Sequence, residues 1–218
     1  MTAPKLVIFD CDGVLVDTET VANKVLSQQL VQIGLHMSPL ECHHAFTGKT
    51  MERCLREVEA LSGQKLPEDW ADMVRAADIE EFRKGVPAIP GLRDVISHLQ
   101  YEGIPYCVGS SGRYEKMHVT LGSSGLLPLF KDVLFSAQDC KDGKPAPDIF
   151  LYAAKGMNTE PKDAVVIEDS IPGIEAGLAA GMRVFGYCGD PLAEPEKVKA
   201  MGATPFEHMS ELPALLGV

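Results

Sequence analysis

Short, continuous apolar runs recur along the chain and predict the strands of a buried sheet. Each run is rich in β-branched or aromatic residues and is bounded by turn-forming or charged residues. The runs are Leu6–Phe9, Tyr106–Gly109, Val133–Phe135, Ala164–Ile167 and Met182–Tyr187. Because their apolar residues do not alternate with polar ones, both faces of these strands are expected to be buried, as in a parallel sheet.

Helical patterns lie between the later runs. Apolar spacing and turn residues predict helices over about residues 92–103, 147–157 and 171–181. Pro147 sits just inside the start of the second helix, and Ser170 is a candidate N-cap for the third. Strands that alternate with helices predict an α/β fold with a doubly wound parallel sheet.

The segment from about Glu19 to Lys84 breaks this alternation, because it has helical periodicity and no convincing strand. Three apolar stripes within it predict three helices. We therefore expect a small helical domain, residues 17–86, inserted into a core of residues 1–16 and 87–218. Packing of the same helices directly on the sheet is the alternative that the pattern leaves open.

Composition and charge narrow the range of possible functions and partners. The 218 residues carry 20 Lys and Arg against 31 Asp and Glu, a formal net charge of −11. Such an acidic chain repels nucleic acid and anionic lipid, so neither is an expected partner. The six cysteines are irregularly spaced without a CxxC pair, and we expect free thiols in a reducing cytoplasm. The first apolar run, four residues long, is too short for a secretory signal, which also favours the cytoplasm.

Polar residues follow the predicted strands, at the edge where open parallel sheets place functional groups. They are Asp10, Asp12, Ser110, Ser111, Lys144, Glu168 and Asp169. Carboxylates that converge at one edge repel one another, and their burial is costly unless a cation is present. Oxygen ligands that leave positions for water and substrate suit Mg²⁺. A divalent ion together with Lys144 would attract a phosphate dianion, whose oxygens Ser110 and nearby amides could hold.

Asp10 and Asp12 need not share one role, because a turn beginning at Cys11 would let them approach the same centre from different directions. Asp10 could attack phosphorus while Asp12 protonates the departing oxygen. Asp12 could then deprotonate the water that cleaves the aspartyl-phosphate.

The sequence around these residues resembles the haloacid dehalogenase superfamily. Residues 9–19, Phe-Asp-Cys-Asp-Gly-Val-Leu-Val-Asp-Thr-Glu, correspond to its first motif. Ser110 matches the second motif, Lys144 the third, and Glu-Asp-Ser-x-x-Gly at 168–173 the fourth. The resemblance covers nearly the whole chain, and the helical insertion is similar to the small helical cap of that family. It implies a Rossmann-like core, Mg²⁺ as cofactor and phosphoryl transfer through Asp10.

The resemblance also implies a role for each acidic residue. Asp10 would be the nucleophile and a metal ligand. Asp12 would be the general acid/base, with its main-chain carbonyl on Mg²⁺. Asp169 would bind the metal, and Glu168 would bind it directly or through water.

The phosphoryl group would be held by Lys144 and by Ser110, or by Ser111 beside it. Lys144 would also offset charge that develops during transfer. Family members that dehalogenate lack the acid at the position of Asp12, so its presence here argues against dehalogenation.

Within the superfamily the chain is most similar to the β-phosphoglucomutase-like group, which contains mutases and many small-molecule phosphatases. Such mutases have a His on the first cap helix, where this chain has Ala22, and an Arg in the cap loop, where it has Met51. Both differences favour water as the phosphoryl acceptor. The stretches 153–158 and 180–185 are similar to bacterial members that hydrolyse sugar phosphates such as 6-phosphogluconate.

We therefore predict a Mg²⁺-dependent hydrolase of a small phosphorylated metabolite, with a sugar phosphate as substrate and no obligate protein partner. A phosphosugar mutase is the alternative. A phospho-accepting signalling domain is a further alternative from a different class, because receiver domains also place acidic residues and a Lys at strand ends.

A few residues outside the motifs have two interpretations each. Thr47 and Lys49 would reach the non-reacting end of a substrate, or belong to an ordinary helix start. Arg113 would contact an anion or lie on a helix surface. Thr18 is expected to be a helix N-cap. The adjacent His43-His44 would face apart on a helix, so no metal pair is expected there.

Overall fold

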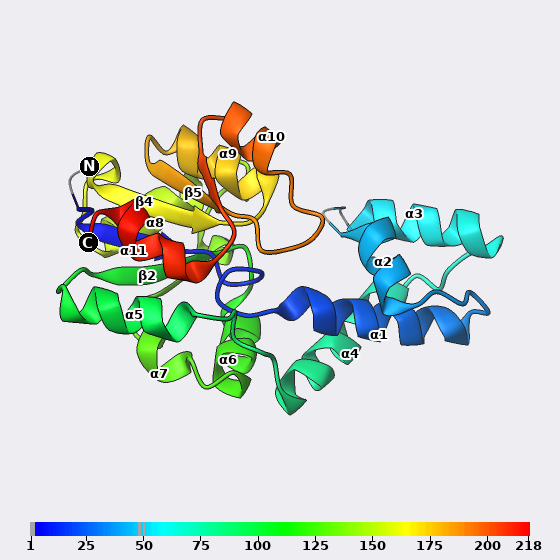
Figure 1. The fold of residues 1–218 in the computed structure, drawn as a ribbon. Helices are drawn as coiled ribbons and strands as arrows, with labels where there is room; N and C mark the ends of the chain where they lie inside the picture. The colour runs from blue at the N-terminus through cyan, green and yellow to red at the C-terminus, as the bar shows by residue number, and fades with distance from the viewer. Residues whose placement is uncertain (1–2, 48, 50) are drawn as a thin grey trace.

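The computed structural model describes residues 3–47, 49 and 51–218. Figure 1 shows a sheet covered by helices and, beside it, a second body made of helices. Within the described residues the sheet has six parallel strands in the order β3-β2-β1-β4-β5-β6. Their bounds are β1 Leu6–Phe9, β2 Tyr106–Ser110, β3 Leu134–Ser136, β4 Ala164–Glu168, β5 Arg183–Tyr187 and β6 Thr204–Phe206.

The chain changes direction across the sheet at β1. Ile8 pairs with Cys107 of β2 on one side and with Val166 of β4 on the other. Strands β2 and β3 therefore extend the sheet on one side of β1, and strands β4, β5 and β6 extend it on the other. Such a reversal is the point where open α/β sheets bind ligands, beyond the carboxyl ends of the strands.

Side chains of β1 alternate between two apolar cores, one on each face of the sheet. Val7 and Phe9 belong to the core that includes α5, α6, α7 and α11, whereas Leu6 and Ile8 belong to the core that includes α8, α9 and α10. All four side chains are fully buried. The predicted Rossmann-like α/β core with strands buried on both faces is confirmed. The helices of this core are α5 Leu92–Tyr101, α6 Tyr114–Ser123, α7 Leu127–Phe130, α8 Asp148–Gly156, α9 Ile171–Ala179, α10 Pro195–Ala200 and α11 Leu212–Leu216.

The sequence pattern missed β6. This strand is three residues long and contains Pro205, and it lies at the edge of the sheet beside β5. A proline within so short a run argues against a strand, although an edge position tolerates it. The N-cap prediction for α9 is confirmed, since Ser170 Oγ accepts a hydrogen bond from the amide of Gly173 at 3.1 Å.

The helical body has an apolar core of its own. Its helices are α1 Thr18–Gln32, α2 Pro39–Phe46, α3 Met51–Ser62 and α4 Trp70–Lys84. Buried Leu30, Phe46, Val58 and Trp70, one from each helix, pack together in this core. We refer to these four helices as the cap. The residue boundaries proposed for it, 17–86, stay a prediction.

Helix α2 was missed, although the sequence carries a signal for it. Ser38 caps the helix and accepts a hydrogen bond from the Glu41 amide, while the Glu41 carboxylate accepts one from the Ser38 amide. Pro39 occupies the first helical position. A Ser followed three residues later by Glu is a capping box, a pattern that marks helix starts.

Two paired segments connect the cap to the core. The Asp17 amide donates to the Pro87 carbonyl at 2.9 Å, and the Ile89 amide donates to the Leu15 carbonyl at 3.0 Å. An isolated bridge also pairs Val16 with Ala88. Chain entry to the cap and chain exit from it are therefore side by side, next to the end of β1.

The thiol prediction is confirmed, because all six cysteines are free. No helix in the described part of the chain combines the length and apolar character needed to span a bilayer.

Candidate active site

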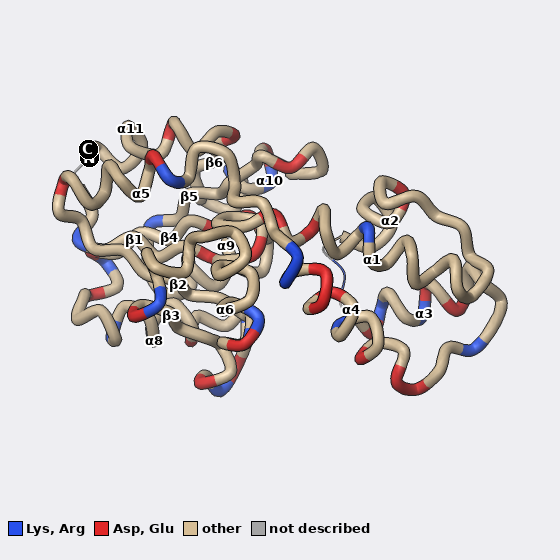
Figure 2. Tube along the Cα trace, turned by 90° about the horizontal axis from the view of Figure 1, so that it is seen from below, with Lys and Arg blue, Asp and Glu red and all other residues tan. Residues whose placement is uncertain are grey.

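Asp10 is the first residue after β1 and lies at the point where the strand order reverses. Its amide donates to the Ile167 carbonyl at 2.9 Å, which continues the pairing of β1 with β4. Its side chain is only 9% exposed. The sheet therefore fixes a buried carboxylate at its carboxyl edge. Figure 2 shows that further Asp and Glu residues gather where the core meets the cap.

Lys144 connects Asp10 to the carboxylate at the end of β4. Its Nζ is 2.5 Å from Asp10 Oδ1 and 2.7 Å from Glu168 Oε1. The same atom lies 4.9 Å from the centre of the Phe150 ring, an arrangement that also favours a cation. Burial alone lowers the pKa of Lys144, but the two carboxylates raise it above its usual value. Lys144 is therefore an ammonium at neutral pH.

Three carboxylates meet at this edge, with oxygen atoms of Asp10, Glu168 and Asp169 within 4.8 Å of one another. Burial raises the pKa of Asp10 to about 7; Lys144 opposes this rise, whereas Glu168 and Asp12 add to it. Burial, with the charges of Glu168 and Asp10, also raises the pKa of Asp169 well above its usual value. Because one ammonium does not balance three carboxylates, two of which are buried, the donor set fits a hard divalent cation such as Mg²⁺.

Two glycines make room for these carboxylates. A Cβ on Gly13 would lie 2.0 Å from Asp169 Oδ2, and a Cβ on Gly173 would lie 1.7 Å from Glu168 Oε1. The second oxygen of Glu168 accepts a hydrogen bond from the Ser170 amide at 2.6 Å. The glycines of the first and fourth motifs therefore define where the acidic side chains lie.

Asp12 is held by two donors. Thr18 Oγ1 donates to Asp12 Oδ1 at 3.0 Å, and Lys116 Nζ donates to Asp12 Oδ2 at 2.7 Å. The prediction that Thr18 is an N-cap is wrong, because α1 begins at Thr18 and its N-cap is Asp17, which accepts from the Thr20 amide at 3.0 Å. The hydroxyl of Thr18 is thus directed to the candidate general acid/base.

The two candidate serines differ in burial. Ser110, at the end of β2, is 1% exposed, and its Oγ accepts a hydrogen bond from the Gly112 amide at 3.0 Å. Ser111 is exposed. Ser136 Oγ donates to the Gly112 carbonyl at 2.7 Å and so fixes the loop. A Cβ on Gly112 would lie 3.3 Å from Ser110 Oγ and 3.7 Å from Asp12 Oδ2, so this turn lies beside Asp12.

The candidate substrate contacts have other partners in this structure. Thr47 Oγ1 is 2.9 Å from His43 Nδ1, and Lys49 Nζ is 2.6 Å from Glu57 Oε2 on α3. Arg113 is exposed at the residue that precedes α6. The structure therefore brings together Asp10, Asp12, Ser110, Lys144, Glu168 and Asp169, but it does not show Thr47 or Lys49 directed at them.

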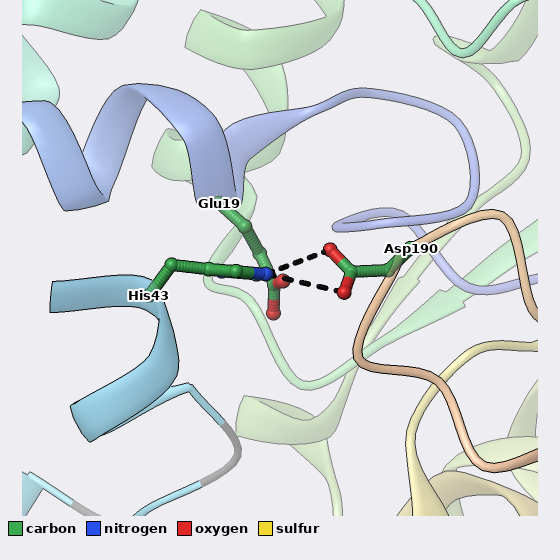
Figure 3. Close-up of side chains that lie close together, drawn as sticks. All are labelled: Glu19, His43 and Asp190. Carbon is green, nitrogen blue, oxygen red and sulfur yellow. Dashed lines mark hydrogen bonds and ion pairs between the residues drawn. The ribbon is translucent and has the colours of Figure 1, made fainter. Parts of the chain in front are cut away.

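A second polar cluster joins the cap to the core (Figure 3). Glu19 of α1, His43 of α2 and Asp190 of the loop after β5 place donor atoms within 4.8 Å of one another. His43 Nε2 is 3.1 Å from each carboxylate oxygen of Asp190. Burial raises the pKa of Glu19, and the nearby charge of Asp190 adds to the rise. The sequence analysis missed this cluster because its members are far apart in the chain.

The hydrogen bonds of His43 indicate whether this cluster acts as a metal site or as a hydrogen-bonded contact. Asn23 Nδ2 donates to the Glu19 carbonyl at 2.9 Å and is 3.2 Å from His43 Nδ1. An amide that donates to Nδ1 places the imidazole hydrogen on Nε2, where it faces Asp190. His43 thus serves as a hydrogen-bond donor between cap and core.

Comparison with known proteins places this geometry in a family. Residues 7–187 match the family described as "Haloacid dehalogenase-like hydrolase". The chain is 32% identical over 216 residues to 6-phosphogluconate phosphatase of Escherichia coli, covering 99% of this chain and 96% of that protein. It is also 32% identical to hexitol phosphatase A of the same organism, covering 82% and 80% of the two chains.

Solved structures of other proteins have the same fold as this chain. A HAD family hydrolase from Deinococcus radiodurans, solved with bound phosphate and sodium, has a TM-score of 0.86 and 30% identity, covering 100% of this chain and 96% of that one. The β-phosphoglucomutase of Clostridium difficile shares the fold, with a TM-score of 0.73 and 22% identity over 97% and 93% of the chains. The chain therefore belongs to the haloacid dehalogenase-like hydrolase family.

Proposed function

We propose that this enzyme is a Mg²⁺-dependent phosphatase of small phosphate esters, chiefly sugar phosphates, and that Asp10 is its nucleophile. Phosphoric monoester hydrolysis is the activity of its curated relatives. The observation that carries the proposal is Lys144, whose Nζ lies between the carboxylates of Asp10 and Glu168 at the point where the strand order reverses.

The chemistry follows from these positions. An oxygen of Asp10 attacks phosphorus, the bond from phosphorus to the leaving oxygen breaks, and Asp12 supplies the proton to that oxygen. Water then attacks the aspartyl-phosphate and gives a proton to Asp12, and the bond between phosphorus and Asp10 breaks. Inorganic phosphate and the original carboxylate result. Lys144 and the Ser110 hydroxyl hold the phosphoryl oxygens.

Asp10, Asp169, Glu168 and the main-chain carbonyl of Asp12 would hold the Mg²⁺ ion. When bound, the ion supplies positive charge that lets nucleophile and phosphate approach each other. The mutually repelling carboxylates of Asp10, Glu168 and Asp169 support this assignment.

The sugar-phosphate class rests on the relatives, whose names specify 6-phosphogluconate and hexitol phosphates. Residues 17–86 would form the cap over such a substrate, with Thr47, Lys49 and Arg113 as candidate contacts for its non-reacting end. Small metabolites of this kind fit the predicted cytoplasmic location.

The residues at the two positions that mark a mutase support water as the acceptor. Ala22 lies on α1 and packs against the core, and Met51 is the first residue of α3. Neither offers a charge to a second phosphate group, so a bisphosphate intermediate would lack these partners.

The test is phosphate release from a panel of sugar phosphates and simple phosphomonoesters, with and without Mg²⁺. Asp10→Asn, checked for native circular dichroism, is the blank. Release that requires Mg²⁺ and is lost in the variant is expected. Activity retained in Asp10→Asn would overturn the mechanism, and conversion of β-glucose 1-phosphate to the 6-phosphate with little free phosphate would favour the mutase.

A further inference from the structure

Lys116 lies between the candidate general acid/base and the cap. It belongs to α6 of the core, and its Nζ donates to Asp12 Oδ2 at 2.7 Å. Its side chain is 33% exposed and that of Asp12 is 28% exposed, so the contact is partly shielded from water. A Cβ on Gly112 would lie 3.8 Å from Lys116 Cδ, which shows that the lysine stem packs against the turn after Ser110.

The other side of Lys116 faces α4 of the cap. Its Nζ is 5.7 Å from the centre of the Phe82 ring. Asp78 lies one turn before Phe82, on the same face of α4. Asp78 Oδ1 is buried and has no hydrogen-bond partner among the residues that the structure describes. Burial raises the pKa of Asp78, and the charge of Lys116 opposes this rise.

Both donors to Asp12 are thus connected to the cap. Thr18, the first residue of α1, donates to Oδ1, and Lys116, against α4, donates to Oδ2. Aromatic faces and carboxylates both attract an ammonium. The first helix of the cap therefore contacts Asp12 through Thr18, and the last helix lies against the lysine that donates to Asp12.

We propose that Lys116 is a positioning residue for Asp12, and that cap helix α4 holds Lys116 in place through Phe82 and Asp78, so that docking of the cap orients the general acid/base. This inference rests on the proposed function, because it assigns Lys116 to the same phosphatase site. It adds a residue outside the four motifs and gives the cap a part in the chemistry as well as in substrate enclosure.

Steady-state kinetics on the best substrate of the panel test the contact with Asp12. Lys116→Met keeps the stem and removes the charge, so we expect kcat to fall about tenfold or more while KM changes less than about threefold. Lys116→Arg restores a donor and should recover part of kcat. Lys155→Met, at an exposed position on α8, is the matched control and should match the parent. Wild-type kcat in Lys116→Met would overturn the proposal.

A double-mutant cycle tests the role of the cap. Asp78→Asn should lower kcat about two- to fivefold in the parent and have no further effect in Lys116→Met, because it acts through the lysine. Equal effects in both backgrounds would overturn the link. Thermal unfolding at pH 8 gives a readout without turnover: Asp78→Asn should raise Tm more in Lys116→Met, where the buried carboxylate has lost its cation. An equal Tm shift in both backgrounds would contradict the contact.

These experiments distinguish a failure of the positioning role of Lys116 from a failure of the proposed phosphatase function. If the parent hydrolyses phosphate esters but Lys116→Met has the same kcat, only the positioning role is wrong. If the parent hydrolyses none, the proposed function fails, and the thermal cycle still decides whether Lys116 and Asp78 interact.

Discussion

The carboxylate of Asp169 occupies the space that a side chain on Gly13 would need, with Oδ2 2.0 Å from the position of a Cβ there. Gly13 also has a left-handed backbone, with φ of +80°. Gly34 has nearly the same φ, +77°, but among the described residues other than its chain neighbours no heavy atom lies within 4 Å of the position of a Cβ there. A comparison of alanine substitutions at these two glycines therefore separates the steric clash of the added methyl group from the backbone strain that it causes.

Gly13→Ala should displace Asp169 and weaken activation by Mg²⁺ by about 10–100-fold. Gly34→Ala should leave the Mg²⁺ dependence unchanged. Both variants should lose about 1 kcal/mol of stability, because alanine is strained at positive φ. The Mg²⁺ concentration for half-maximal activity and the free energy of unfolding in urea measure the two effects. An unchanged Mg²⁺ dependence in Gly13→Ala would show that Asp169 is not a ligand.

Binding of Mg²⁺ should release protons at neutral pH. Burial raises the pKa of Asp10 to about 7, so this carboxyl is about half protonated at pH 7 when no cation is bound, and burial also raises the pKa of Asp169. A bound cation requires the ionised forms, so release on the order of one proton is expected at pH 7. Apparent affinity for Mg²⁺ should therefore rise as pH rises through the pKa of Asp10, about 7.

Calorimetric titration at pH 7 in two buffers with different ionisation enthalpies measures this release. The observed heat should differ between the buffers, and the difference should shrink in Asp10→Asn. Equal heats in both buffers would contradict the raised pKa values.

The sequence predicted the elements that local chemistry determines. Continuous apolar runs marked five of the strands. The motif residues Asp10, Ser110 and Glu168 lie at strand ends because a parallel sheet gathers them at one edge, and Lys144 lies in the loop that precedes α8. Lys116 carries no such signal: its contact with Asp12 depends on where α6 lies relative to the loop after β1, which no local pattern encodes.

Asp78 should make the stability of the protein depend on pH. Its pKa is raised from 3.8 to about 7, chiefly by burial, so the folded state holds a proton that the unfolded chain releases near pH 4. Its contribution to stability therefore falls as pH rises from 4 to 7 and is constant above 7. Asp78→Asn removes the buried charge and should raise the free energy of unfolding on the order of 1–2 kcal/mol at pH 8.

Urea unfolding at pH 5 and pH 8 tests this expectation, with a smaller gain at pH 5, where the folded carboxyl is already protonated. Asp72→Asn on the same helix is the control, because Asp72 is 79% exposed and pairs with Arg75. A gain that is the same at both pH values would show that Asp78 does not titrate near neutrality.

His43 should not create a second metal site, despite lying with Glu19 and Asp190 in an arrangement of metal-binding residue types. The Asn23 amide donates to its Nδ1, so Nε2 carries the hydrogen and presents a donor to Asp190 where a metal would need a lone pair. Equilibrium dialysis with Mn²⁺ should therefore give one ion per chain, in His43→Ala as in the parent.

The matched variant for this measurement is Asp169→Asn, which should lose the ion, because Asp169 belongs to the other cluster of potential ligands. A stoichiometry of two that falls to one in His43→Ala would show that the imidazole changes its tautomer to bind metal. If the chain binds one ion only, the contact of His43 with Asp190 is a hydrogen bond between α2 of the cap and the loop after β5 of the core. Because that bond is partly exposed, its loss should cost less than about 1 kcal/mol, and its effect should appear in the placement of the cap.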